Sequence, residues 1–146
     1  MSIDRLKELV SQNRVWFEGT AHESESELAG YETTLGTPLP ESIRWILSNH
    51  GYSRPCGVPS LNEAVRATLL CRDQLSLPVH YLILEDRGDA GIIVMNLDSG
   101  VVLWLGSYQV ADLAIGEPVL ESEYVFPDFA AWVEYCLEFE KDLANE

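Results

Sequence analysis

Apolar residues recur every three or four positions through the first half of the chain, a spacing that predicts amphipathic helices. The pattern places four of them, at residues 2–11, at about 24–35, from Pro40 to His50 and at about 60–73. Gly36 follows the second helix and Gly51 follows the third. Both glycines are expected to end their helices, because glycine readily adopts the left-handed conformation found there.

The third helix carries one large side chain that does not fit its apolar stripe. Ile43, Ile46 and Leu47 share one face, and Trp45 lies off that face, on the side expected to meet solvent. Tryptophan is enriched among the anchors of protein interfaces, so Trp45 is a candidate binding residue. Partial burial beneath the loop at 52–59 is an equally good interpretation.

Three apolar runs follow, at residues 79–84, 91–97 and 101–105, with polar turns between them. The middle run is apolar on both alternating faces, which is typical of a central strand covered on both sides. Two short turns joining three strands predict an antiparallel meander at about 79–105. Residues 107–125 are ambiguous, with room for one edge strand.

The fourth and the last helix each have a predicted buried stripe. In the helix at 60–73 the stripe consists of Leu61, Val65 and Leu69. The last helix opens at Pro127 and Asp128. Its stripe consists of Phe129, Trp132, Val133, Cys136, Leu137 and Leu143.

These elements define the expected fold. A chain of 146 residues has the size of one ordinary domain, and it buries roughly 70% of its unfolded surface without needing disulfides or metals. We expect a single compact α+β domain over residues 1–146. Its central, largely antiparallel sheet should be flanked by the N-terminal helices and a C-terminal helix.

The charge distribution narrows the possible partners. The chain holds 24 acidic and 9 basic residues, a formal net charge of −15, and in residues 85–146 only Arg87 and Lys141 are basic. We expect neither a nucleic acid nor a membrane as partner, since nucleic acids and anionic membrane surfaces both bind clustered lysine and arginine. A basic protein would be attracted instead. A merely solvated acidic surface is an equally good interpretation.

The cysteines and the N-terminus indicate a cytoplasmic location. Cys56, Cys71 and Cys136 are an odd number, widely spaced and without a CxxC pair, which is typical of a reducing compartment. The first residues do not form a basic region followed by an apolar core. No run reaches the ~18 apolar residues of a membrane span.

Four acids of the two turns offer the oxygen ligands that divalent cations prefer. They are Glu85, Asp86, Asp89 and Asp98. Aspartate in a turn is, however, ordinary turn chemistry, so solvated turns are the more economical interpretation. The histidines at 22, 50 and 80 stand far apart, at no spacing typical of a metal site. We therefore predict neither a metal nor a cofactor.

Cys56 is a candidate nucleophile, because it lies in a Pro/Gly loop that His50 or His80 could approach. No catalytic signature surrounds it, and the chain contains no GxSxG, no P-loop and no GxGxxG that opens a helix. Cys71 and Cys136 lie on apolar helix faces and are expected to be small core residues. The chain is therefore not expected to be an enzyme.

The segment that leads into the third helix carries a recognisable pattern. Glu32-Thr33-Thr34-Leu35-Gly36-Thr37-Pro38-Leu39-Pro40, with the helix that ends at Gly51, resembles the N-terminal signature of the SUKH superfamily. That group includes the fungal Smi/Knr-type cell-wall regulators and many bacterial toxin-immunity proteins. The later helix, the meander and the terminal helix follow in the order of the family, so the resemblance covers about residues 24–140.

The resemblance implies a compact α+β fold and a protein-binding role, often the neutralisation of a toxin that is commonly a nuclease. Two departures stand out. Trp45 occupies a position that is usually polar in such sequences, and Lys7 and Lys141 are the only lysines. These departures leave the partner open, because members of the family vary most at their binding surfaces.

The residues and the resemblance together predict an immunity or antitoxin-like protein that neutralises a cognate toxin, such as a basic nuclease, through an acidic surface. The alternative is a regulatory or scaffolding module of the same fold that binds a cellular protein unrelated to toxins. The residues predicted to bind the partner are Trp45, Glu85, Asp86, Asp89, Asp98, Glu121 and Glu123.

Overall fold

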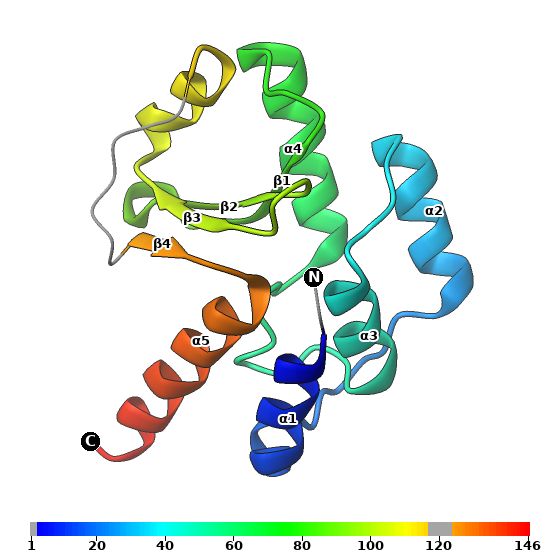
Figure 1. Ribbon diagram of the computed structural model, residues 1–146, viewed down its shortest axis with the longest axis vertical. Helices are drawn as coiled ribbons and strands as arrows, with labels where there is room; N and C mark the ends of the chain where they lie inside the picture. The colour runs from blue at the N-terminus through cyan, green and yellow to red at the C-terminus, as the bar shows by residue number, and fades with distance from the viewer. Residues whose placement is uncertain (1–2, 117–123) are drawn as a thin grey trace. The chain divides into compact units, whose positions relative to one another are not determined.

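The computed structural model describes residues 3–116 and 124–146 (Figure 1). Its internal contacts divide the chain into two compact units, Met1–Pro59 together with Phe129–Glu146, and Ser60–Asp128. Helices and one four-stranded antiparallel sheet make up the structure, so the predicted α+β class is confirmed. The extent of one domain over residues 1–146 stays a prediction. None of the helices within the described ranges is long and apolar enough to cross a membrane.

The first unit is helical. It contains α1 (Asp4–Gln12), the 3-10 helix η1 (Arg14–Phe17), α2 (Glu25–Leu35), α3 (Glu41–Asn49) and α5 (Phe129–Ala144). Helix α1 packs beside α5. The fully buried side chains of this unit include Leu6, Phe17, Leu28, Ile43, Ile46, Leu47, Trp132 and Val133. The apolar stripe predicted for the third helix is therefore confirmed.

Local signals set the ends of α2. The Ser24 hydroxyl accepts the Glu27 N–H at 3.1 Å, and the Glu27 carboxylate accepts the Ser24 N–H at 3.2 Å, so each satisfies a backbone donor of the other. Gly36 closes the helix with a φ of +73°, as predicted. Helix α3 begins at Glu41, one residue later than predicted, because Pro40 adopts an extended conformation with a ψ of 142°.

The second unit is built around the sheet. It contains α4 (Leu61–Leu75), β1 (Tyr81–Asp86), the 3-10 helix η2 (Gly88–Ala90), β2 (Ile92–Asn96), β3 (Val102–Leu105), the 3-10 helix η3 (Ser107–Ala114) and β4 (Val125–Phe126). The strands lie in the order β1-β2-β3-β4, and each is antiparallel to the next. The predicted meander is confirmed, and β4 supplies an edge strand at the end of the ambiguous segment.

Strand β2 has the double-sided burial that its sequence predicts. Ile92, Ile93, Val94 and Met95 are all buried. One face of the sheet contributes to an apolar cluster against which Ala67 and Cys71 of α4 also pack. Its buried members are Leu77, Tyr81, Ile83, Ile92, Val94, Leu105, Val110 and Leu113.

Helix α4 lies beside β1 and is joined to it through Thr68 (Figure 1). The hydroxyl of this buried side chain donates to the Ala64 carbonyl at 2.7 Å and accepts the Ile83 N–H at 2.9 Å. Thr68 thereby satisfies a buried backbone donor of the outer strand of the sheet.

Two predicted stripes are wrong at one position each. Leu69 is 36% exposed, because the buried face of α4 is centred on Thr68 and its neighbours at 61, 64 and 65. Leu143 is 44% exposed. At about 100° per residue it lies on the same side of α5 as Phe139, away from the face that Val133 and Leu137 bury.

Candidate protein-binding surface

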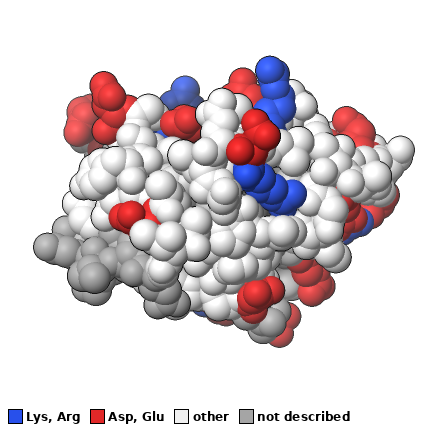
Figure 2. All heavy atoms as spheres, turned by 90° about the horizontal axis from the view of Figure 1, so that it is seen from above, with Lys and Arg blue, Asp and Glu red and all other residues white. Residues whose placement is uncertain are grey.

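Much of the chain's positive charge is used to neutralise its own acids. The ion pairs of the described residues include Arg5–Glu134, Arg44–Glu32, Arg44–Glu25, Arg54–Glu140, Arg87–Glu85 and Lys141–Glu138. Figure 2 shows one face of the molecule, on which the acidic side chains are dispersed among uncharged ones. On this face the excess negative charge forms a broad field rather than one acidic patch.

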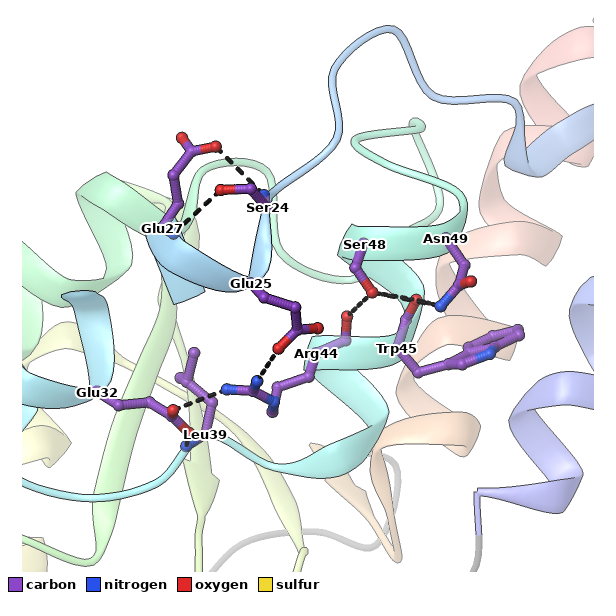
Figure 3. A network of polar contacts seen from close by, with 9 residues as sticks. All are labelled: Ser24, Glu25, Glu27, Glu32, Leu39, Arg44, Trp45, Ser48 and Asn49. Atoms are coloured by element: carbon purple, nitrogen blue, oxygen red, sulfur yellow. Dashed lines mark hydrogen bonds and ion pairs between the residues drawn. The ribbon is translucent and has the colours of Figure 1, made fainter. Parts of the chain in front are cut away.

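The segment that resembles the SUKH signature forms a corner between α2 and α3 (Figure 3). One oxygen of Glu32 accepts the Leu39 N–H at 2.7 Å, and the other accepts from the Arg44 guanidinium at 2.7 Å. Glu25, in the first turn of α2, contacts the same guanidinium. These contacts join two helices, so the motif supports the fold.

Trp45 follows Arg44 on α3 but points away from this network (Figure 3). Its ring is half-buried, with the His50 ring tilted against it at 5.0 Å and the Lys7 ammonium 5.8 Å from its centre. The ring is therefore partly buried, against His50 and Lys7, whereas burial beneath the loop at 52–59 stays a prediction. A partner can reach only the part of it that these neighbours leave open.

Three of the predicted acids lie together around the turn that joins β1 to β2. The Glu85 carboxylate accepts from the Arg87 guanidinium at 2.8 Å, and an Asp86 oxygen accepts the Gly88 N–H at 2.8 Å. Both acids thus help to shape the turn. Asp89 is exposed, and its carboxylate has no hydrogen bond or ion pair within the part of the chain that is described.

An aromatic ring supports this turn from β3. The Trp104 indole N–H donates to the Ala90 carbonyl at 2.7 Å, and the Arg87 guanidinium lies over the ring, 4.9 Å from its centre. Tyr124 meets the same ring edge-on at 6.3 Å. The β1–β2 turn is therefore an ordered surface on which a cation, an acid and two aromatic rings lie close together.

Asp98, the fourth of the acids considered as cation ligands, does not belong to this group. It lies in the β2–β3 turn, where the Asn96 side-chain oxygen accepts the N–H groups of Asp98 and Ser99. The β1–β2 and β2–β3 turns are at opposite ends of β2, whose five residues span roughly 15 Å. Glu121 and Glu123, the remaining predicted binding residues, lie outside the described residues.

The candidate metal ligands of the described residues are not arranged as a metal site. Within residues 3–116 and 124–146 no three histidine, cysteine or acidic side chains could hold a metal ion. A ring nitrogen of His22 lies 3.2 Å from the Ser48 carbonyl oxygen. Burial lowers the pKa of His50, and the charges of Arg14 and then His22 lower it further.

The cysteines have the surroundings of packing residues. Cys56 is buried, and its thiol donates to the Val58 carbonyl at 3.2 Å. Cys71 and Cys136 are half-buried. Burial raises the pKa of the Cys71 thiol, and the charge of Asp86 raises it further, so its thiolate is disfavoured at neutral pH.

Glu23 is buried, although nothing in the sequence pattern distinguishes it from the neighbouring glutamates. Glu23 accepts the Tyr52 hydroxyl at 2.7 Å through one oxygen. Its other oxygen is buried without a hydrogen-bond partner among the described residues. Burial raises the pKa of Tyr31, and the charges of Glu23 and then Glu27 add to the shift. This carboxylate links the segment before α2 to the one after α3.

Sequence reasoning missed a row of apolar side chains on α5. Tyr135, Phe139 and Leu143, here called the α5 stripe, are four residues apart and are 42%, 55% and 44% exposed. Tyr135 stacks on the buried Trp132 ring, with centres 5.7 Å apart and planes 11° from parallel. The signal was present in the spacing, because α5 carries more large apolar residues than one buried face can hold.

Comparisons with known proteins do not identify a family for this chain. No protein-family model matches the chain, and neither a curated protein nor a solved structure matches it. The resemblance to the SUKH superfamily therefore rests on the residues of the α2–α3 corner and on the order of the elements.

Proposed function

We propose that this chain is a cytoplasmic protein-binding module of the immunity or antitoxin type, as the SUKH resemblance implies. It neutralises a cognate basic toxin, such as a nuclease, by covering it. The proposed action is binding alone, without catalysis and without a cofactor.

The charge balance is the observation that carries this proposal. Of 9 basic residues, Arg5, Arg44, Arg54, Arg87 and Lys141 already contact the chain's own carboxylates, and the net charge is still −15. Such a field destabilises the compact state by self-repulsion, and a basic protein would relieve it. Opposite charges also speed the encounter with that protein.

The exposed turn acids fit the recognition of a nuclease. The carboxylates of Asp89 and Asp98 are exposed and make no hydrogen bond or ion pair with the described residues. A nuclease groove presents cations to phosphate oxygens, and carboxylate oxygens can accept from the same arginine and lysine donors. A protein that offers such acids can occupy the groove in place of the nucleic acid.

Co-expression tests the proposal in cells. The product of the gene next to this one would be expressed with and without the chain, and growth would be measured. We expect that product to arrest growth alone and the chain to restore growth. Growth arrest that the chain does not relieve would contradict the immunity role. Binding to an unrelated cellular protein would favour the regulatory module instead.

The acidic mechanism has its own measurement. The association rate of the purified pair should fall at least tenfold between 50 and 500 mM salt, because salt screens exposed charges. Asp89→Lys with Asp98→Lys should slow association further. Asp73→Lys, on the exposed side of α4 in the same unit, is the matched control. An association rate that salt does not change would rule out electrostatic recognition.

A further inference from the structure

We propose that the α5 stripe is a second contact surface, which inserts into an apolar groove of the basic partner while lysine or arginine residues at the groove's rim meet the acids of α5. This inference rests on the proposed function, since it names the part of the chain that the partner touches.

The stripe has the size and spacing of a helical recognition surface. Residues four apart on a helix form a ridge, and a helix that binds in a groove presents anchors at such intervals. Three half-exposed large side chains offer about 300 Å² of apolar surface. Exposed apolar patches of that size on a monomer are often functional.

The helix that carries the stripe is fixed within its own unit. The buried Trp132 indole donates to the Gly57 carbonyl at 3.0 Å. Arg5 of α1 pairs with Glu134 at 3.2 Å, and the Lys141 ammonium donates to the Asn13 side chain at 2.9 Å. Because α5 is already ordered, binding through the stripe costs little conformational entropy.

Charge complementarity identifies the occupant. Glu134, Glu138 and Asp142 precede Tyr135, Phe139 and Leu143 by one residue each, so an acidic row runs parallel to the apolar one. Arg5 and Lys141 contact Glu134 and Glu138, but these side chains are still 50% and 62% exposed, and Asp142 is exposed too. A groove that covers the stripe places its rim against this row, and cations at the rim would be favoured there.

A second copy of the chain fits the stripe less well. It would bring another acidic row against the first, and the only cation on α5, Lys141, is already held by Asn13 and Glu138. The stripe also offers far less than the ~800 Å² per partner of a standard interface. A basic partner can complete that area through its contacts with the surrounding acids.

A peptide selection tests the inference on the intact chain. A phage-displayed library of random 20-residue peptides would be selected on the immobilised protein. We expect selected peptides to be net basic, with apolar residues three or four apart. Phe139→Ser with Leu143→Ser should weaken their binding at least tenfold. Leu70→Ser is the matched control, since Leu70 is 54% exposed on α4, and it should change binding less than twofold.

A charge-reversed pair makes the test independent of the apolar substitutions. Glu138→Lys with Asp142→Lys should weaken the binding of the same peptides at least fivefold at low salt. If the serine variant does not fold, this binding measurement alone tests the inference. A different result is that basic peptides bind the serine variant and the charge-reversed variant as well as the parent, yet fail to bind Asp89→Lys with Asp98→Lys. That result would overturn this inference and leave the proposed function standing. Peptides without basic residues that still require Phe139 would contradict both. A parent dimer that the serine variant dissociates would show that a second copy covers the stripe, and would overturn the inference.

Discussion

Arg44 in the first unit and Arg87 in the second have similar neighbours, but their ion pairs span different distances along the sequence. Each side chain is little exposed, at 27% and 29%, and each pairs with a glutamate, at 2.7 and 2.8 Å. Arg44 contacts Glu32 and Glu25, which precede it by 12 and 19 residues. Arg87 contacts Glu85, only two residues before it.

The difference separates charges that hold the fold from charges that shape a surface. A contact across 12 residues joins α3 to α2, so its loss affects how two helices pack. A contact across two residues orders one turn, whose backbone is also held by Asp86 and by the Trp104 indole. We therefore expect Glu32 of the α2–α3 corner to be unavailable to a partner. The acids of the β1–β2 turn should be replaceable with little loss of stability.

The largest expected effect is that of Glu32→Ala. This change removes the acceptor of the Leu39 N–H and the better buried partner of Arg44, so it should lower the free energy of unfolding by about 3 kcal/mol. Urea unfolding measures it. Glu25→Ala is the control, because Glu25 is 74% exposed and its pair with Arg44 should contribute only about 0.5 kcal/mol. Equal losses from the two changes would show that Glu32 stabilises the fold no more than Glu25 does.

Arg87→Ala should have a smaller effect, of about 1 kcal/mol in the same measurement, because the ion pair that it removes is short-range and the other contact is with a ring. The indole N–H resonance of Trp104 should shift, since the ring loses the cation above it. Arg66→Ala, on the exposed side of α4, should leave the free energy of unfolding and the Trp104 resonance unchanged. A destabilisation as large as that of Glu32→Ala would mean that the β1–β2 turn also holds the fold.

The smallest expected effect concerns pH and belongs to the first unit. The pKa of His50 is lowered in the folded chain, so on acidification the unfolded chain takes up this proton first, starting near the ordinary value of 6.5. The stability that His50 contributes is therefore complete above pH 7.5 and declines as the pH falls through 6.5 toward the lowered pKa. In the His50→Gln variant the free energy of unfolding should therefore depend less on pH between 7.5 and 5.5. An equal decline in the variant would show that other groups cause it.

Much of the fold followed from local patterns. Ser24 and Gly36 mark the ends of α2 through their own chemistry, and the double-sided apolar run of β2 predicts a central strand. The α2–α3 corner was recognisable only as a motif. The pairing of Glu32 with Arg44 depends on where two helices cross, which periodicity does not encode.

The candidate site was harder to predict for the same reason. Asp98 stands 9 residues after Asp89 in the chain, but a strand carries it to the far end of the sheet. Trp45 fell correctly outside the stripe of its helix, yet Lys7 of α1 returns to cover part of its ring. Phe139 lies outside the predicted stripe, because one buried face accounts for most of the apolar residues of α5 and periodicity alone does not indicate a second row.

The Thr68 hydroxyl also has a consequence for how the folded chain behaves at high concentration. An outer strand with open N–H groups is a template on which another molecule can add a strand, and this is a common start of aggregation. Here the Ile83 N–H is already taken by a buried hydroxyl, and the helix that carries it lies along β1. Polymerisation through β1 would require α4 to detach first, so this edge of the sheet stays closed to self-assembly while the helix is in place.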